Sequence, residues 1–302
     1  MDFNKFLDDI FDEKNSLQSS LLSNLSHLSR EELCIFKEKW ARAPLERKRE
    51  IIENLLEIAD ANVEFDFDPI FKICLDDEDG EVKKKAIRGL KDCDDLSFMR
   101  KLIKLLQDKD EGVREMAASA LGDFTLRAEL GKLSKEVSEC LEKALLNVLE
   151  ADDSLRVKRR AIESLGHFSR ERVKEEIIKA YRSGDRELRI GAIYAMGKNC
   201  DPSWIPFLME SLESHDPEIR YEAARSCGEI GAKKMVPKLI NLLKDPDDEV
   251  KLMTIITLGK IGGEEALRKL KECLEDEDEL VREAAQEALS YISFWKDPLS
   301  FE

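Results

Sequence analysis

Apolar and charged positions follow a helical period along the chain, and one pattern recurs seven times between residues 79 and 290. Each copy has an aliphatic anchor, a small residue four positions later and an apolar residue eight positions later, which together form one buried stripe of a helix. A second amphipathic run precedes each copy. The pattern therefore predicts repeated pairs of antiparallel helices, an A helix and then a B helix. The B-helix anchors are Val82, Val113, Val157, Leu188, Ile219, Val250 and Val281.

The spacing of the anchors predicts how the chain is organised. Successive anchors are 31 residues apart, except for one interval of 44 that contains an insertion near residues 125–138. We expect this insertion to form an edge loop or to extend an A helix. Seven repeats then occupy residues 65–294. Residues 1–64 form an N-terminal helical cap with a degenerate helix pair, and residues 295–302 form a C-terminal tail. Stacked pairs share a core that one pair cannot form, so we predict an all-α fold, an α-solenoid.

Individual columns of the repeat have their own physical roles. Asp stands three residues before the anchor in six of the seven copies, where its carboxylate can cap the B helix. Lys or Arg follows every anchor and can form an ion pair along the helix or with a neighbouring repeat. Gly stands nine residues after the anchor in five copies, which predicts a close approach of two helices. The column five residues after the anchor becomes polar only at Gln286, so we expect it to face the next repeat.

The consensus D-x-x-[VIL]-[RK]-x-x-A-x-x-x-[LM]-G, together with the 31-residue period, resembles the HEAT-repeat family. It is most similar to the short bacterial repeats that also occur in phycobilisome-lyase-like proteins. The resemblance covers about three quarters of the sequence. It implies a right-handed superhelix of antiparallel helix pairs. HEAT arrays serve many tasks, so the resemblance implies a fold and not one activity.

Charge, hydropathy and cysteine content indicate which kinds of partner and which cellular location to expect. Acidic residues number 65 and basic residues 49, giving a net charge of −16, which argues against a protein that coats nucleic acid. Much of the acid lies in the turns between A and B helices and favours a basic partner. No apolar run reaches the ~18 residues that a membrane span needs, and the acidic start does not read as a secretory signal. Seven cysteines without a C-x-x-C spacing favour a reducing, cytoplasmic location without disulfides.

Some proteins of similar architecture are enzymes, so we compare their catalytic motifs with this sequence. The HEAT-type deoxyhypusine hydroxylases hold two irons with paired His-Glu steps, whereas the three histidines here precede Leu28, Phe168 and Asp216. No nucleophile motif or phosphate loop is present either. We therefore predict no catalytic residues, no metal and no cofactor, and prefer a non-catalytic adaptor for a protein or peptide. The alternative that stays open is a lyase-like or chaperone-lyase subunit acting on a cofactor-bearing client protein.

One surface changes character along the repeats. Positions two and six after the anchor are expected to point away from the core, on the inner wall of the solenoid. They are polar in repeats one, two, three and seven but largely apolar or aromatic in repeats four to six, as a binding patch rimmed by charge would be. These residues either bind a partner or pack on one another and on the tail. The candidate partner-binding residues are Ile190, Tyr194, Tyr221, Arg225, Leu252, Met253 and Ile256.

Overall fold

The structure is a computed structural model that describes the backbone of residues 3–296 and the side chains of residues 3–294. Over this described range the protein forms helices and no strand, so the prediction of an all-α solenoid is confirmed. The chain divides into two compact units, Met1–Phe124 and Thr125–Glu302. The boundary lies within helix α8 (Glu111–Glu129). We call these the N-terminal and C-terminal units and describe each by itself.

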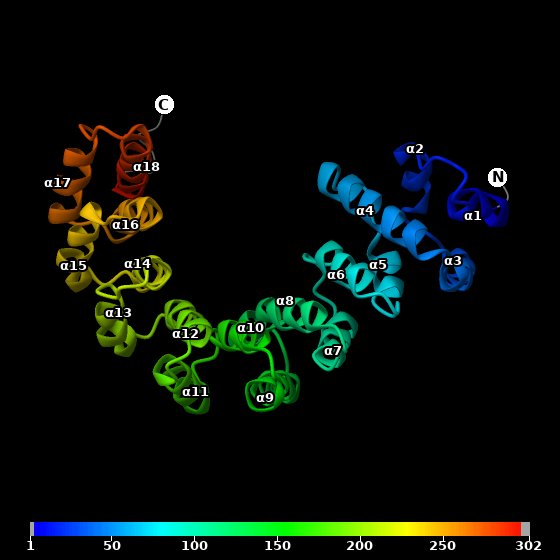
Figure 1. The fold of residues 1–302 in the computed structure, drawn as a ribbon, viewed down its shortest axis with the longest axis horizontal. Helices are drawn as coiled ribbons and strands as arrows, with labels where there is room; N and C mark the ends of the chain where they lie inside the picture. Colours follow the sequence, from blue (N-terminus) through cyan, green and yellow to red (C-terminus); the bar gives the residue numbers. More distant parts are fainter. Residues whose placement is uncertain (1–2, 297–302) are drawn as a thin grey trace. The chain divides into compact units, whose positions relative to one another are not determined.

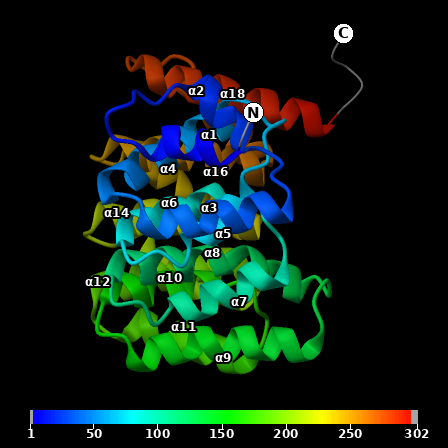
Figure 2. The same cartoon turned by 90° about the vertical axis from the view of Figure 1, so that its right-hand side faces the viewer.

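The N-terminal unit is a stack of helix pairs, and Figure 2 shows α3, α5 and α7 one below another. Its B-type helices α4 and α6 pack side by side. Up to the start of α8, its elements are α1 (Phe3–Phe11), α2 (Ser19–Leu22), η1 (Ser23–Leu25), α3 (Arg30–Arg42), α4 (Leu45–Ala61), α5 (Asp68–Cys74), α6 (Gly80–Gly89) and α7 (Leu96–Leu105).

Helix α1 is docked on α3 and α4. The ring of Phe11 lies 5.7 Å from that of Phe36 and 6.3 Å from that of Trp40, both on α3. The buried Arg47 of α4 donates from Nε to the carbonyl of Ile10 at 2.6 Å and from Nη2 to the carbonyl of Asn15 at 2.8 Å. A charged group in the interior is stable only with such partners. Arg47 therefore fixes the end of α1 and the loop after it against the degenerate helix pair α3–α4.

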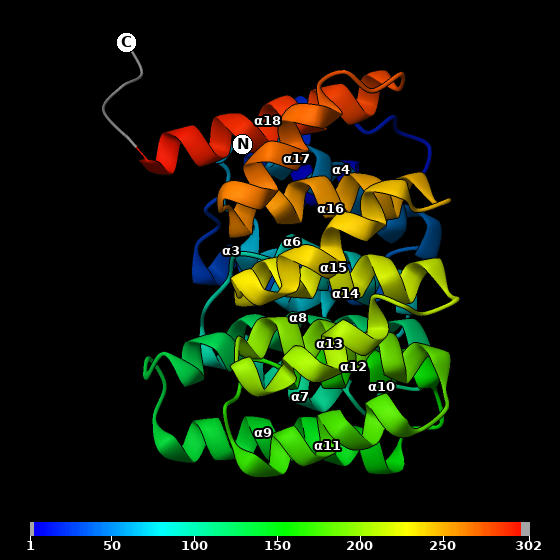
Figure 3. The ribbon, with the colours of Figure 1, turned by 90° about the vertical axis from the view of Figure 1, so that its left-hand side faces the viewer.

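The C-terminal unit has two layers of helices. In Figure 1, α10, α12, α14, α16 and α18 lie on one side, and Figure 3 shows the opposite layer with α11, α13, α15 and α17 in front. The helices of the first layer pack consecutively. After α8, the elements are α9 (Lys135–Ala151), α10 (Leu155–Leu165), α11 (Glu171–Arg182), α12 (Arg186–Asn199), η2 (Pro202–Trp204), α13 (Ile205–Ser211), α14 (Pro217–Ile230), η3 (Lys233–Met235), α15 (Val236–Asn241), η4 (Leu242–Lys244), α16 (Asp248–Ile261), α17 (Glu264–Cys273) and α18 (Glu279–Lys296).

The predicted N-caps are present at the start of each B helix. The side chain three residues before the anchor accepts a hydrogen bond from the first helical turn in every repeat, as at Asp185, which accepts from Leu188 N at 3.1 Å. The other six caps are Asp79, Asp110, Ser154, Asp216, Asp247 and Asp278. A side chain two residues before each cap also accepts from the backbone N–H of the cap residue, and it is always Asp or Ser. This second acceptor fixes the turn between the A and B helices.

The glycine column holds successive B helices close together, as predicted. A Cβ at Gly166 would lie 2.6 Å from the Cα of Ala195, and one at Gly197 would lie 2.5 Å from Ser226 Oγ. The facing position is the residue seven after the anchor of the next repeat, which is therefore small. Two of these residues add a link between repeats, because Ser226 donates to the carbonyl of Ile193 at 2.9 Å and Thr257 to that of Ala224 at 3.0 Å.

The column five residues after the anchor behaves as expected at the end of the array. It is buried in the first six repeats, whereas Gln286 in the last repeat is exposed. This exposure is expected for a position that packs against the next repeat in all other repeats, because α18 is the last described helix. The assignment of residues 65–294 to the solenoid and 1–64 to a cap stays a prediction. Helix α18 continues to Lys296, and the rest of the predicted tail, residues 297–302, lies outside the described residues.

The insertion does not form a long loop. It lengthens the B helix α8, which runs to Glu129, and the following A helix α9, which runs from Lys135. A short link with Gly131 at φ +71° joins the two helices. Leu126 and Leu130 are 41% and 61% exposed. Sequence analysis allowed an extension of the A helix but missed the extension of the B helix.

Candidate partner-binding surface

The candidate residues lie on three consecutive helices, α12, α14 and α16, which pack side by side in one layer of the C-terminal unit. We call the surface of these helices that carries the candidates the B-helix wall. Five candidates on it are half-buried and Ile256 is 42% exposed. The half-buried ones are Tyr194, Tyr221, Arg225, Leu252 and Met253.

Ile190 differs from the other candidates because none of its surface is exposed. The residue beside it is Gly191, where a Cβ would lie 2.8 Å from Ile162 Cγ2 and 3.0 Å from Arg159 Cγ. The missing side chain lets α10 approach α12 closely, which buries the neighbouring Ile190. We therefore leave Ile190 out of the binding surface and assign it to the core.

Two of the candidates contact each other directly. The guanidinium carbon of Arg225 lies 4.3 Å from the centre of the Tyr194 ring, a cation–π contact between α14 and α12. Lys198 Nζ lies 5.6 Å from the same ring. Burial raises the pKa of the Tyr194 hydroxyl above its ordinary value, and the nearby Arg225 opposes that rise. Tyr and Arg are the residue types that most often anchor protein interfaces.

The Arg225 side chain is held in place by a buried carboxylate. Glu222, one turn earlier on α14, accepts from Arg225 Nη2 at 2.6 Å and from Arg225 Nε at 3.0 Å. Burial raises the pKa of Glu222, and the hydrogen bonds from Arg225 oppose that rise. Ser226 Oγ also lies within 3.4 Å of the same carboxylate. These contacts hold the Arg225 guanidinium over the Tyr194 ring.

Sequence analysis missed an ion-pair network that borders this surface on α10. Arg159 pairs with Glu163 at 2.9 Å, with Glu187 at 2.8 Å and with Glu218 at 3.4 Å, so it links three successive B helices. Burial alone would lower the pKa of Arg159, but hydrogen bonds to Glu163 and Glu187 raise it above the usual value. The sequence signal is an acid directly before the anchor in repeats four and five, Glu187 and Glu218.

The character of the B-helix wall changes from α12 to α16. On α12 and α14 it carries the ion-paired Arg225 and the aromatic Tyr194, whereas Tyr221 on α14 adjoins the aliphatic residues of α16. On α16, the half-buried Leu252 and Met253 lie within one turn of the exposed Ile256. The surface therefore offers an apolar strip beside a fixed Tyr–Arg pair.

Five of the seven thiols are less acidic than a free cysteine. Burial raises their pKa, which disfavours the reactive thiolate form. These thiols belong to Cys74, Cys93, Cys200, Cys227 (to about 12) and Cys273. Across the described residues, no group of three His, Cys, Asp or Glu side chains is arranged to hold a metal ion. None of the described helices is long and apolar enough to cross a bilayer.

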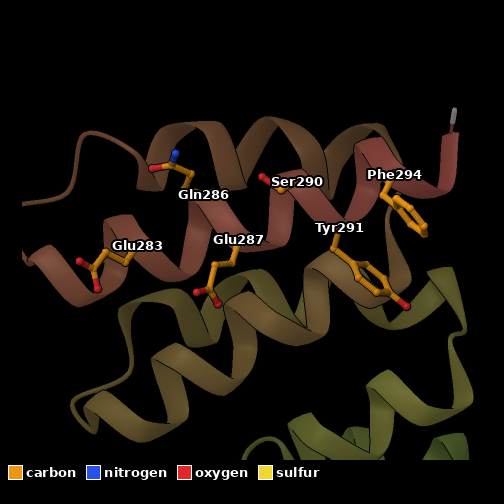
Figure 4. Close-up of a pocket in the computed structure, with 6 residues that line it drawn as sticks. All are labelled: Glu283, Gln286, Glu287, Ser290, Tyr291 and Phe294. Atoms are coloured by element: carbon orange, nitrogen blue, oxygen red, sulfur yellow. The ribbon is translucent and has the colours of Figure 1, made fainter. Parts of the chain in front are cut away.

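A hollow of about 820 Å³ lies along α18, the last helix of the array. Figure 4 shows Tyr291 and Phe294 near the C-terminal end of this helix, with Glu283 and Glu287 on earlier turns. Gln286 and Ser290 complete the described lining, which comes from α18 alone. Among the described residues, no second helix contributes a polar group to this hollow that could orient a ligand.

Comparison with known proteins identifies the repeat. The model of the HEAT-repeat family matches three consecutive regions, residues 67–139, 142–215 and 205–290. The chain belongs to the HEAT-repeat family. These HEAT repeats cover the predicted anchors from Val82 to Val281, so the resemblance drawn from the sequence is confirmed. No curated protein matches this sequence.

Several solved structures are similar to this HEAT-repeat protein at low identity. The Escherichia coli protein YibA is 18% identical, and the match covers 78% of this protein and 96% of YibA with a TM-score of 0.47. Human deoxyhypusine hydroxylase in complex with glycerol is 19% identical, and the match covers 87% of this protein and 96% of the hydroxylase with a TM-score of 0.39. Kap95p bound to RanGDP is 13% identical, and the match covers 96% of this protein and 50% of the other with a TM-score of 0.40.

Proposed function

We propose that this protein is a non-catalytic HEAT-repeat adaptor that binds a protein or peptide through the B-helix wall. The observation that carries the proposal is the Tyr194–Arg225 pair, held by Glu222, next to the apolar strip of Tyr221, Leu252, Met253 and Ile256. The corresponding positions in the flanking repeats are charged or polar. An aromatic and apolar centre with a charged surround is the usual composition of a protein interface.

The charge distribution supports a basic partner segment. Glu187 and Glu218 border the wall, and both carboxylates are part of the Arg159 network. The protein as a whole has a net charge of −16, which attracts a basic partner over long range at low salt. We therefore propose a partner segment with an apolar stretch for the strip and basic residues for the carboxylates around it. We propose a cytoplasmic location on the sequence argument alone.

Removing the apolar strip tests the proposal. The Y221S/L252S/I256S variant keeps the Tyr194–Arg225 pair and the core, because the three replaced side chains are half-buried or exposed. We expect unchanged helicity, a Tm within a few degrees of the original, and at least about a tenfold loss of partner capture. The measurement is circular dichroism together with quantitative capture by the immobilised full-length protein from an extract of its own cells.

A matched control replaces exposed leucines elsewhere in the same unit. Leu155 and Leu280 are 41% and 58% exposed and stand in the first turn of α10 and α18. The L155S/L280S variant is expected to capture the partner as the original protein does. Unfolding of the triple variant would show that the strip is core, and equal capture by both variants would show that the partner binds elsewhere.

A further inference from the structure

The turns between A and B helices contain a repeated link between neighbouring repeats. Arg220, directly after an anchor, donates to Asp245 of the next repeat through Nε and Nη2, each at 2.7 Å. Asp245 also accepts the backbone N–H of Asp247 at 3.0 Å. Lys83 pairs with Asp108 in the same way, 25 residues further on. In these two cases a carboxylate at this turn position pairs with the basic residue of the preceding repeat.

Repeat four lacks this carboxylate. Its basic residue is Arg189, and the residue 25 positions later is Ser214. Ser214 Oγ still accepts the backbone N–H of Asp216 at 3.2 Å, so the turn itself is preserved. Arg189 instead donates from Nη2 to Tyr181 OH at 3.2 Å and to Glu210 at 3.4 Å. The turn thus keeps its shape but loses the acceptor that Arg220 has in repeat five.

Arg189 is left with an unused donor. Its Nε is buried without a hydrogen-bond partner, and no other buried side-chain nitrogen or oxygen among the described residues is in this state. In repeat five, the corresponding Nε of Arg220 is the atom that binds Asp245. Buried donors without a partner are rare and costly in folded proteins. The geometry of repeat four therefore retains one half of a bidentate carboxylate site.

A cavity of about 420 Å³ lies beside Arg189, and three arginines and Tyr181 contribute to its lining. Arg186 is already neutralised, because it binds Asp216 at 2.5 Å and Glu218 at 2.6 Å. Arg182 is within 5.9 Å of the Phe207 ring and has no acidic partner in the described part of the protein. Tyr181 lies under the Arg189 guanidinium, 4.8 Å from its ring centre, and keeps that group in place.

The acids in this cavity are already engaged or lie at the surface. The Asp185 carboxylate caps α12 by accepting from Leu188 N at 3.1 Å. The Glu210 side chain is 66% exposed, and its one ion pair with the described residues is the long contact of 3.4 Å with Arg189. An incoming carboxylate can displace Glu210 toward solvent and gain two shorter hydrogen bonds. Arg182 then adds a positive charge that no internal acid among the described residues neutralises.

We propose that Arg189 binds a carboxylate of a partner protein in this cavity, through the same two donors that Arg220 uses for Asp245. The site lies at the turn edge of α12 and α14 and uses none of the B-helix wall residues, so it is independent of the function proposed above. Its ligand is a planar carboxylate, supplied by an acidic side group or by the C-terminus of the partner. The Nε and Nη2 donors bind it side by side, as in the Arg220–Asp245 pair.

The test follows the arginine Nε–H resonances of the full-length protein by NMR, with Arg189 assigned from the R189K spectrum. Two probes are titrated at constant ionic strength, Ac-Ala-Asp-Ala-amide for an aspartate carboxylate and Ac-Ala-Ala-Ala-OH for a terminal one. We expect the Arg189 Nε–H signal to shift and saturate at about millimolar probe. The Arg220 signal should stay fixed, because Asp245 already occupies its site. The probe that binds more tightly identifies the source of the carboxylate.

Two variants at position 214 separate binding from structure. S214D places a carboxylate where Arg220 has Asp245, so we expect at least about a tenfold weaker probe response and an unchanged or higher Tm. S214A lacks a carboxylate and should respond like the original protein, within about twofold. The proposal is overturned if neither probe moves Arg189, if S214D responds as the original does, or if inorganic phosphate binds more tightly than both peptides. If S214D does not fold, the comparison of Arg189 with Arg220 in the original protein decides the question alone.

Discussion

Replacing Gly197 by valine is expected to destabilise the C-terminal unit by about 3 kcal/mol or more. A Cβ at this position would lie 2.5 Å from Ser226 Oγ, 2.8 Å from its Cβ and 2.9 Å from its Cα. A change of rotamer cannot relieve the clash, because the Ser226 Cα in the backbone of α14 is part of the contact. Helices α12 and α14 must then separate, which also strains the hydrogen bond from Ser226 to the carbonyl of Ile193. Urea denaturation followed by circular dichroism measures the loss.

A glycine at the same position of the next repeat provides the control. At Gly228 the nearest atom to an added Cβ is Thr257 Oγ1 at 3.3 Å, and the other close atoms also belong to side chains. We expect G228A to cost about 1 kcal/mol or less, because these side chains can move by a few tenths of an ångström. Equal losses for G197V and G228A would show that the glycine column is not set by close packing between repeats.

Replacing Asp245 by serine is expected to destabilise the same unit by about 3 kcal/mol. The side chains of Arg220 and Asp245 are only 11% and 3% exposed, so the variant leaves a buried guanidinium without its bidentate partner. A serine at position 245 should preserve the turn. Ser214 stands at the same position of the neighbouring repeat, and its hydroxyl accepts the backbone N–H of the capping residue Asp216. The loss therefore reports on the ion pair alone and not on the shape of the turn. Urea denaturation at pH 7 measures it.

The cost of this substitution should depend on pH. Burial alone would raise the pKa of Asp245, but hydrogen bonds from Arg220 and from the N–H of Asp247 outweigh it, and the pKa lies below its ordinary value. The unfolded protein then binds the proton more readily than the folded one. The stabilisation is present above the ordinary pKa of about 3.9 and is lost as the pH falls through the folded-state value. The difference in unfolding free energy between D245S and the original protein should become smaller in acid. A difference that does not change with pH would show that the Arg220–Asp245 pair is not its source.

The repeat and its polarity were predictable because they rest on local chemistry. The anchors, the capping Asp residues and the column that ends at Gln286 each follow from periodicity or helix capping, and the structure bears them out. The second turn acceptor was missed because Asp and Ser at that position look like ordinary polar turn residues. Its role depends on a contact between repeats, because Asp245 accepts hydrogen bonds from both Asp247 N and Arg220.

The candidate surface was harder to predict because side-chain orientation depends on the distance between helices. Ile190 has the same position in its repeat as Tyr221 and Leu252, yet Gly191 brings α10 so close that Ile190 is buried. The Tyr194–Arg225 contact joins two helices and depends on rotamers that Glu222 fixes. Neither distance nor rotamer is encoded in a single-repeat pattern. The choice of residues on α14 and α16 stays a prediction from the sequence.

Site-specific photo-crosslinking shows whether a partner lies on the B-helix wall, as we propose. A benzoylphenylalanine at position 256 places the probe on the exposed part of α16, and one at Lys179 places it on α11 in the opposite layer. Both full-length proteins are irradiated in extract of their own cells. We expect one crosslinked protein partner from position 256 that is lost in the Y221S/L252S background and is not formed from position 179. Equal crosslinking from both positions, or a crosslink from position 179 alone, would contradict it.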